Sequence, residues 1–437
     1  MVVVAVAAWC RLAAAGNGSS LFVGHEAALV GGAVVATVRD GSAVYYNPAG
    51  LASIDDDTLD LSASAYALRF GGNVELKADA ADGNATERRL SRLDLNLVPV
   101  GLAYARRLGA WRGAFGVFAP AQTSSYPRSY VATARGAETR QGVLAGNDIF
   151  FEYNGGLAFA RTVAPGLRLG AGLLVLYSSR SQAFGLGTDA AVDGETTTFA
   201  QFFGVTDQIL VGAQAIWGLQ VDIAAPVHLG LTFRSPVFQL YELAQTLVVY
   251  GEASAPSPAL RQAVVVDEFF GLKSQTLKPM RLDGGVAVDL GRARLSADAT
   301  VQAPYADPTG LASLSGQWNV RLGARMPVFK DWVGGAGVFT DRSAIDAKRS
   351  PTAPSFDFYG AIAGVQMATR YRLAPSAARD APRALTFTTT VAFSYAYGAG
   401  RLGNVVLGGL DQPDLATRTT TTDAHQLVLH FGSTSAL

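Results

Sequence analysis

The chain has 437 residues, with 35 acidic and 35 basic side chains, so that its formal net charge is zero. Charged residues make up only 16% of it, against roughly 25% in ordinary globular proteins. A neutral chain offers no electrostatic argument for a nucleic-acid partner, and we exclude that class. The single cysteine, Cys10, excludes a disulfide framework and a thiolate metal site.

The first residues predict an export signal. Residues 2–15 are apolar except for Arg11, and they are too few for a membrane-spanning helix of about 20 residues. They end in three alanines, which resemble a cleavage site, so we expect residues 1–15 to be a signal peptide, truncated because it lacks a basic start. A buried strand is the alternative interpretation. No other apolar run approaches helix-spanning length, so a membrane protein with this sequence would have to be a closed β-barrel.

Residues 39–52 fit neither a helix nor a strand. Pro48 lacks a backbone donor and pushes Asn47 out of the helical region, while Gly50 permits a positive φ. Asn-Pro is therefore a turn signal, but here it is surrounded by tyrosines and aliphatic side chains, which is unusual for a surface turn. We predict irregular backbone that is buried inside the rest of the protein.

From residue 58 onward the sequence shows the period of two that is typical of amphipathic strands. In residues 293–303 every odd position is apolar, while the even positions are polar or charged. Residues 280–290 and 317–326 repeat this pattern. We predict fourteen strands, near 58–69, 95–107, 111–119, 148–161, 167–180, 207–222, 227–236, 278–290, 293–303, 315–326, 332–342, 356–370, 384–398 and 424–432.

The connections between these strands alternate between short turns and long polar or glycine-rich loops. The long loops are expected near 70–94, 120–147, 181–206, 237–277, 343–355 and 399–423. This sorting is typical of an outer-membrane barrel, whose apolar side chains face lipid, and not of a soluble sandwich with Greek-key crossings. We therefore predict an all-β fold, a 14-stranded antiparallel transmembrane β-barrel, with both chain ends on the short-turn side.

Three short motifs lie ahead of the first predicted strand: Gly31-Gly32-Ala33, Arg39-Asp40-Gly41-Ser42-Ala43 and Tyr46-Asn47-Pro48-Ala49-Gly50-Leu51. Together they resemble the start of the FadL/TodX family of outer-membrane transporters for hydrophobic compounds, including long-chain fatty acids. Weaker similarities extend along nearly the whole chain, at 116–120, 229–236 and 337–341.

The resemblance implies a hatch of residues 16–57 that plugs a barrel of residues 58–432, followed by a C-terminal tail of residues 433–437. It also implies passive transport of hydrophobic compounds across the bacterial outer membrane, with the chain ends in the periplasm. Capture by extracellular loops would be followed by hatch rearrangement and lateral release beside a kinked third strand. The implied hatch motif is Asn47, Pro48, Ala49 and Gly50.

The third predicted strand carries the residues that would open the wall. Glycine and proline weaken β-ladders and mark bends, which fits a lateral opening, although a plain barrel corner is the alternative. The residues concerned are Gly113, Gly116 and Pro120.

Two of the predicted loops are rich in large apolar side chains. A water-exposed loop of this composition either buries itself or binds an apolar ligand, and both interpretations stay open. The candidate ligand-binding residues are Phe199, Phe202, Phe203, Leu247, Val249, Phe269 and Phe270.

Charged side chains on the polar strand faces should point into the lumen, where burial demands partners. Arg321 or Arg325 could attract a fatty-acid carboxylate, although pairing with lumen acids is the favoured interpretation. The predicted lumen charges are Arg281, Asp283, Arg321 and Arg325.

Nothing in the sequence predicts an enzyme. There is no G-x-S-x-G elbow, His425 and His430 should lie on opposite strand faces, and sequence alone assembles no Ser–His pair. We expect no catalytic residue, metal or cofactor, and a monomer that contacts outer-membrane lipid and a hydrophobic ligand. Three alternatives stay open: a structural or receptor barrel, a lipid-modifying barrel enzyme, and a general porin.

Overall fold

In a computed structural model, the chain forms a closed antiparallel β-barrel of 14 strands, which confirms the predicted fold class. The structure describes residues 21–71, 75–78, 85–89, 94–224, 226–254, 257–270, 278–306, 313–345, 355–372, 384–407 and 415–436. The expected signal peptide lies outside these residues. Within them, no helix is both long and apolar enough to cross a membrane.

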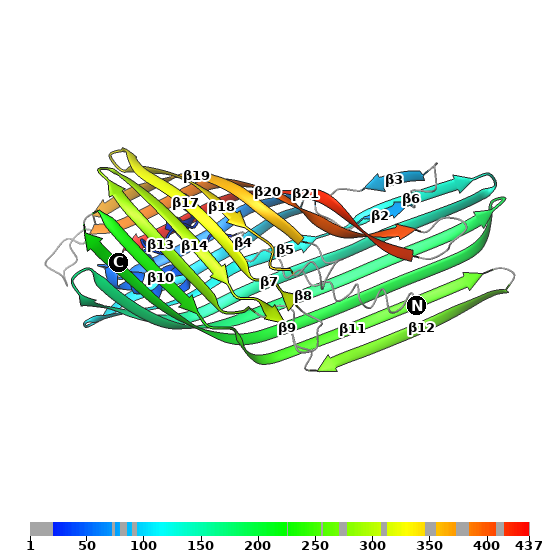
Figure 1. Cartoon of the computed structure of the whole chain (residues 1–437), viewed down its shortest axis with the longest axis horizontal. Helices are drawn as coiled ribbons and strands as arrows, with labels where there is room; N and C mark the ends of the chain where they lie inside the picture. The colour runs from blue at the N-terminus through cyan, green and yellow to red at the C-terminus, as the bar shows by residue number, and fades with distance from the viewer. Residues whose placement is uncertain are drawn as a thin grey trace.

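Successive strands of the wall pair with their neighbours, and β1 pairs with β21 to close the barrel (Figure 1). Two strands of the wall are each divided into two pieces. One consists of β10 and β11, which both pair with β9. The other consists of β12, which pairs with β11, and β13, which pairs with β10. The strands are β1 (Thr58–Gly71), β2 (Leu76–Ala78), β3 (Ala85–Arg89), β4 (Asp94–Leu108), β5 (Trp111–Ser125), β6 (Arg128–Arg135), β7 (Glu138–Ala164), β8 (Leu167–Val192), β9 (Glu195–Ala224), β10 (Val227–Arg234), β11 (Phe238–Ser254), β12 (Ser257–Phe270), β13 (Arg281–Leu290), β14 (Ala293–Gln302), β15 (Tyr305–Ala306), β16 (Ser313–Leu314), β17 (Gln317–Phe329), β18 (Trp332–Asp341), β19 (Ser355–Arg372), β20 (Ala384–Leu407) and β21 (Leu415–Ala436).

Several predicted loops are strands instead. Residues 181–206 belong almost entirely to β8 and β9, and residues 237–277 contain the β11–β12 hairpin. Strands β7, β8 and β9 therefore reach 27, 26 and 30 residues and extend far beyond the rest of the barrel at the end opposite the short turns (Figure 1). Strand β21 runs to Ala436, so residues 433–436 are part of the wall and not a tail.

The outer face of the wall is apolar and the inner face is polar. In β10, the alternate residues Leu229, Leu231 and Phe233 are exposed, whereas Thr232 and Arg234 are buried. A water-soluble protein shows the opposite arrangement, with large apolar side chains inside. Other exposed apolar side chains of the outer face are Trp111, Leu157, Trp318, Leu322 and Phe393.

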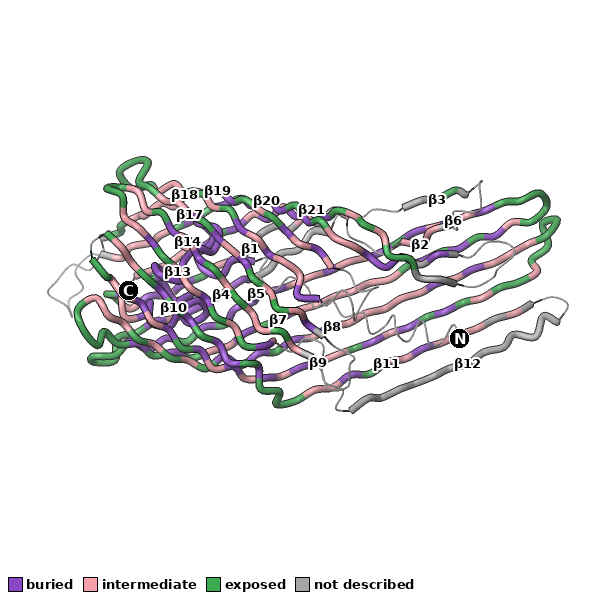
Figure 2. Tube along the Cα trace, in the orientation of Figure 1, coloured by how far each residue is buried: buried purple, intermediate pink, exposed green. Residues whose placement is uncertain are grey.

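Residues 21–57, which we call the N-terminal segment, lie inside the barrel near its short-turn end and are mostly buried (Figure 2). The segment contains α2 (His25–Leu29), α3 (Ala43–Tyr46) and the 3-10 helix η1 (Pro48–Ser53). Helix α2 contacts β18 to β21, while η1 contacts β5, β7, β8 and β9. The segment therefore reaches from one side of the lumen to the other.

Candidate functional site

The wall has a break between β4 and β5. Their ladder ends at the pair Gly101–Phe118, although β4 continues along β1 and β5 continues along β7. A register shift between Phe118 and Ala121 leaves Pro120 outside the β5–β7 ladder as well. Proline cannot donate a ladder hydrogen bond, which explains why the pairing fails here. Among the described residues, β4 and β5 make no further pair beyond this point.

Of the three residues predicted to open the wall, only Pro120 lies at the break. Gly113 and Gly116 lie in the regularly paired part of β5. A side chain at Gly116 would overlap with the ring of Phe118, so this glycine makes room for the ring instead of bending the strand. The ring of Phe118 is buried and lies 5.7 Å from the ring of Tyr45, centroid to centroid. The aromatic contact between Phe118 and Tyr45 of the N-terminal segment therefore lies where the β4–β5 ladder stops and the break begins.

The predicted hatch motif is the most deeply anchored part of the N-terminal segment. Asn47 has extended backbone angles, and its side-chain oxygen accepts a hydrogen bond from Ala49 N at 3.1 Å, which caps η1 at Pro48. The Asn47 amide group donates to Val35 O at 2.8 Å and to Leu219 O of β9 at 3.1 Å. One fully buried side chain thus joins two parts of the segment to the wall.

Two wall glycines allow this close approach. Gly218 of β9 faces the Asn47 side chain, and Gly170 of β8 faces the backbone of Pro48. A Cβ atom at either position would overlap with the motif. The motif therefore docks on the wall at positions that carry no side chain, as expected where two backbones approach closely.

Charged side chains of the wall hold the segment elsewhere. Arg325 forms an ion pair with Glu26 at 2.9 Å, and the buried Asp298 accepts a hydrogen bond from Val35 N at 2.9 Å. Arg234 donates to Tyr45 O and lies 4.5 Å from the centre of the Tyr45 ring. These contacts use charges that the sequence places inside a barrel, but they bind the segment instead of a ligand.

The other predicted lumen charges lie in the same region. Arg281 and Asp283 form an ion pair at 2.8 Å, and Asp283 is almost fully buried. Arg321 is buried against Gly32 of the N-terminal segment. Because Arg325 is paired with Glu26 and Arg321 is buried, the geometry favours contacts within the protein over attraction of a free carboxylate by either arginine.

A buried cluster fastens the segment to the two strands that close the barrel. His25 Nδ1 lies 3.0 Å from Asp40 Oδ2 and 2.8 Å from Thr434 Oγ1 of β21. Thr434 donates to Asp60 of β1, which accepts a 2.6 Å hydrogen bond from Gly41 N. The cluster thus links both ends of the 25–41 stretch to the seam between β1 and β21.

Charge stabilises this cluster. Burial alone would lower the pKa of His25, but the neighbouring Asp40 carboxylate outweighs it and raises that pKa to about 9. Burial alone would raise the pKa of Asp40, but the charge of His25 and hydrogen bonds from Ser42 hold it below its usual value. The pair is therefore ionic at neutral pH.

A separate apolar cluster lines the inner face of the long hairpins. Its buried members are Leu76, Val131, Leu144, Leu186, Phe202 and Val248. Phe184 and Tyr250 pack against it. It lies beyond the N-terminal segment, on the part of the sheet that extends away from the short-turn end (Figure 2).

The predicted ligand-binding residues belong to strands and not to loops, and only some face inward. Phe202 is 3% exposed and belongs to the apolar cluster, whereas Phe203 is 39% exposed on the opposite face of β9. Phe199 lies on the outer face with Phe203, and Leu247 and Val249 of β11 pair opposite outer-face residues of β9. The inward Val248 is not among the predicted ligand-binding residues, because a stretch expected to be a loop has no inner and outer face. The side chains of Phe269 and Phe270 lie outside the described residues.

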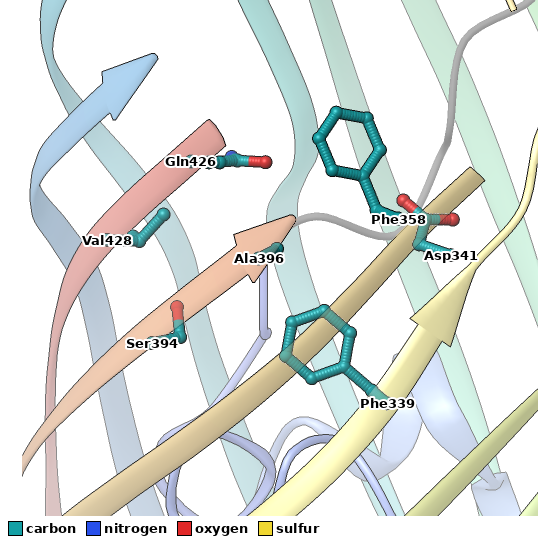
Figure 3. A pocket seen from close by; sticks show the side chains of 7 residues that line it. All are labelled: Phe339, Asp341, Phe358, Ser394, Ala396, Gln426 and Val428. Atoms are coloured by element: carbon teal, nitrogen blue, oxygen red, sulfur yellow. The ribbon is translucent and has the colours of Figure 1, made fainter. Parts of the chain in front are cut away.

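A small cavity lies in the lumen at mid-barrel, between β18, β19, β20 and β21 (Figure 3). The space open to the centre of a water molecule is about 10 Å³. The ring of Phe22, from the N-terminal segment, packs edge-on against Phe339 at 5.1 Å between centroids. The lining residues are Phe339, Asp341, Phe358, Ser394, Ala396, Gln426 and Val428.

The structure brings together a serine and a histidine that the sequence did not. Ser394 Oγ and His430 Nε2 are 3.0 Å apart, because β20 and β21 are neighbours and the two residues are diagonal in their ladder, where Ser394 pairs with Val428 and His430 pairs with Ala392. Both are buried, at 4% and 1% exposure, and the Phe22 ring lies 5.5 Å from the His430 ring, centroid to centroid. Among the described residues, no group of three or more His, Cys, Asp or Glu side chains is placed to hold a metal ion.

The inward polar face, the enclosed N-terminal segment and the interrupted wall define a plugged β-barrel. Solved structures with this fold include the toluene transporter TodX of P. putida, with a TM-score of 0.58 and 12% identity over 96% of this chain and 99% of that one. A FadL homologue from Pseudomonas aeruginosa gives 0.57 and 13% over 96% and 100%. The CymD monoaromatic hydrocarbon channel gives 0.55 and 14% over 95% and 97%. No protein-family model matches the chain, and no curated protein does.

Proposed function

We propose that this protein is a passive transporter of hydrophobic compounds across the bacterial outer membrane. The observation that carries the proposal is the break between β4 and β5, because the wall lacks ladder hydrogen bonds there, next to the N-terminal segment that fills the lumen. An outer face of exposed apolar side chains suits a barrel in lipid. The solved barrels of the same fold, by their titles, carry toluene and monoaromatic hydrocarbons.

The route begins at the long-hairpin end, which we place outside the cell. An apolar molecule would enter the cluster around Phe202 and Leu186, where it loses contact with water. It would then descend to the N-terminal segment, which acts as the hatch, and leave through the break beside Phe118 into the lipid. In this orientation the start of β1 and the described end of β21, which pair at Thr58 and Ala436, lie at the periplasmic side.

Three rival functions fit less well. A general porin needs an open aqueous channel, whereas the hatch crosses this lumen and is held by ion pairs and hydrogen bonds. A structural or receptor barrel would need neither a break in its ladder nor an apolar cluster facing inward. The Ser394–His430 pair gives a lipid-modifying enzyme a nucleophile and a base, but both side chains are buried and the ring of Phe22 lies against His430.

Uptake by intact cells tests the function. The full chain is expressed in a Gram-negative host that lacks its own outer-membrane transporter for hydrophobic compounds. We expect faster uptake of labelled toluene and oleate than in cells with an empty vector, and no change for a labelled disaccharide. Faster disaccharide uptake would indicate a porin, and unchanged uptake of all three would reject transport. Hydrolysis of an ester supplied to the purified protein would indicate the enzyme.

A further inference from the structure

The outer face of the barrel carries a wide groove over strands β14 and β17 to β20. Cross-strand pairing places five outward side chains in one row, of which the middle three are small. The row consists of Leu295, Ala324, Ala336, Ala363 and Phe393. The groove has a volume of about 720 Å³, and its lining is almost entirely apolar. This volume lies within the range of about 300–1,000 Å³ that is typical of small-molecule sites.

Docking of the N-terminal segment explains the small residues on the inner side of this patch but not those on the outer side. A Cβ atom at Gly335 of β18 would overlap with Leu29 of α2, so the inward glycine makes room for the segment. Ala336, the next residue, points outward and is exposed, as is Ala363 opposite it on β19. No described part of the chain therefore covers the groove, and it is free for another molecule.

The depth of the groove indicates what that molecule is. Strand β17 ends at Phe329 and β18 begins at Trp332, and these side chains are 72% and 40% exposed. Exposed aromatic side chains at the end of a spanning strand are typical of the membrane–water interface. The groove begins beside them, at Met326 and Gly334, and extends away from the short turns. A lipid acyl chain is the apolar group that a membrane supplies at this depth.

Two exposed cations lie at the short-turn end of the groove. Arg292 is in the β13–β14 turn and Lys330 is in the β17–β18 turn, and each turn adjoins a strand that lines the groove. Asp331 shares the second turn, which leaves a surplus of one positive charge. Long basic side chains at the ends of spanning elements reach the level of the lipid headgroups and attract their phosphates. An anionic headgroup therefore fits this end of the groove.

We propose that the groove binds one anionic glycerophospholipid of the periplasmic leaflet. Its acyl chain would lie over Ala336 and Ala363, and its phosphate would lie at Arg292 and Lys330. The inference rests on the membrane orientation given under the proposed function, but it does not depend on transport. It requires that one lipid be held by its chain and its phosphate together, unlike the exchanging lipids around the rest of the barrel.

Three probes separate the contribution of the chain from that of the phosphate. Dioleoyl phosphatidylglycerol, dioleoylglycerol and glycerol phosphate are added one at a time to the full chain in detergent, and bound mass is read by native mass spectrometry. We expect one phosphatidylglycerol per chain, bound about tenfold more tightly than dioleoylglycerol, and no measurable binding of glycerol phosphate. A mass of two chains without lipid would instead make the groove an interface between copies and would reject the lipid site.

Variants that fill the groove assign the bound chain to it. Ala336→Leu and Ala363→Leu should each lower the affinity for phosphatidylglycerol by about tenfold, the effect expected when about two methylene groups of the lipid lose their contact. Ala171→Leu, which adds the same side chain to the exposed outer face of β8 away from the groove, is the matched control and should change nothing. The shift of the folded barrel on unheated gels shows that each variant is folded.

Variants without the cations assign the phosphate. Arg292→Gln combined with Lys330→Gln should bring the affinity for phosphatidylglycerol down to that for dioleoylglycerol, which should not change. Arg161→Gln removes an exposed cation near the short-turn end of β7 and should leave both affinities as they are.

Equal binding of phosphatidylglycerol and dioleoylglycerol, or equal affinities in the Ala336→Leu and Ala171→Leu variants, would overturn this proposal. Uptake of toluene and oleate by cells would still stand in that case, because the groove lies away from the break between β4 and β5. Conversely, a bound phospholipid without uptake by cells would keep the site and reject transport.

Discussion

At the scale of single residues, the contact between Asn47 and Gly218 decides how firmly the hatch is held. Asn47 reaches the backbone of β9 only because Gly218 has no side chain. The amide makes two hydrogen bonds to carbonyl groups and its oxygen caps η1. Either a smaller residue at 47 or a larger one at 218 should therefore loosen the same docking.

We predict that Gly218→Ala weakens the docking of the hatch by about 1–3 kcal/mol, because the new methyl group overlaps with the Asn47 side chain. Hydrogen exchange of residues 21–57 would show this as lower protection than in the unaltered protein. Gly284→Ala on β13 is the matched control, since an added Cβ there meets nothing within 4 Å. Equal protection in both variants would mean that this contact does not hold the hatch.

The ionic pair of His25 and Asp40 makes the docking of the hatch depend on pH. The pKa of His25 is raised from 6.5 to about 9, so its contribution is complete below 6.5 and is lost as the pH rises through about 9. Full loss would remove about 3 kcal/mol. The lowered pKa of Asp40 adds stability that is lost only on acidification below its ordinary range. The docked hatch should therefore be most stable between these limits.

Protection factors for residues 21–57, corrected for intrinsic exchange, should fall between about pH 6.5 and pH 9, the interval from the ordinary to the raised pKa of His25. His25→Gln should remove this fall and lower protection already at neutral pH, because Asp40 stays buried beside Asp60 without a cation. His425→Gln, on the outer face beside Tyr395, should behave like the unaltered protein. An alkaline fall of the same size in the His25 variant would assign it to another group.

At the scale of elements, the long hairpins carry the proposed entry site on one face only. Phe202 and Phe203 are neighbours on β9 but point to opposite sides, one into the apolar cluster and one outward. We predict that Phe202→Ser reduces uptake of toluene or oleate at limiting concentration by about fivefold to twentyfold, as expected for the loss of roughly 1–2 kcal/mol of apolar contact. Phe203→Ser should leave uptake within about twofold. Equal effects would remove the inward cluster from the route.

Sequence patterns predicted the wall well and its extensions poorly. Where apolar and polar residues alternate strictly, as in 293–303, the strand is found where expected. Residues 181–206 contain glycine, threonine and aspartate, which also suit loops, and they become strands because neighbouring hairpins of equal length pair with them. Local sequence does not contain that information.

The candidate site, like the wall, could be predicted from the sequence only in part. Asn47-Pro48 is visible in the sequence because the turn signal and the surrounding aromatic residues conflict with a surface position. The break at Gly101 and Phe118 is not visible, since it depends on where the ladder between two strands stops. The Ser394–His430 pair and the mid-barrel cavity were missed for the same reason, because cross-strand register brings their residues together.

At the scale of the whole molecule, lateral release of an apolar compound requires that the barrel be closed to water and open to lipid at one place. The wall closes through β1 and β21, the N-terminal segment fills the lumen near the short-turn end, and the β4–β5 ladder stops at Gly101 and Phe118 beside it. A cross-link that seals this break should therefore stop release without altering capture or the hatch.

The most direct measurement is uptake of labelled toluene by cells whose protein carries Val100→Cys and Ala119→Cys, the two positions just beyond the last pair of the β4–β5 ladder, in a chain with Cys10 replaced. The control carries Ala105→Cys and Ala114→Cys, which already face each other in the paired part. We predict that oxidation of the first pair lowers uptake by about tenfold or more and that a reductant restores it, whereas the control is unaffected. Undiminished uptake with the first cross-link complete by mass spectrometry would contradict lateral release.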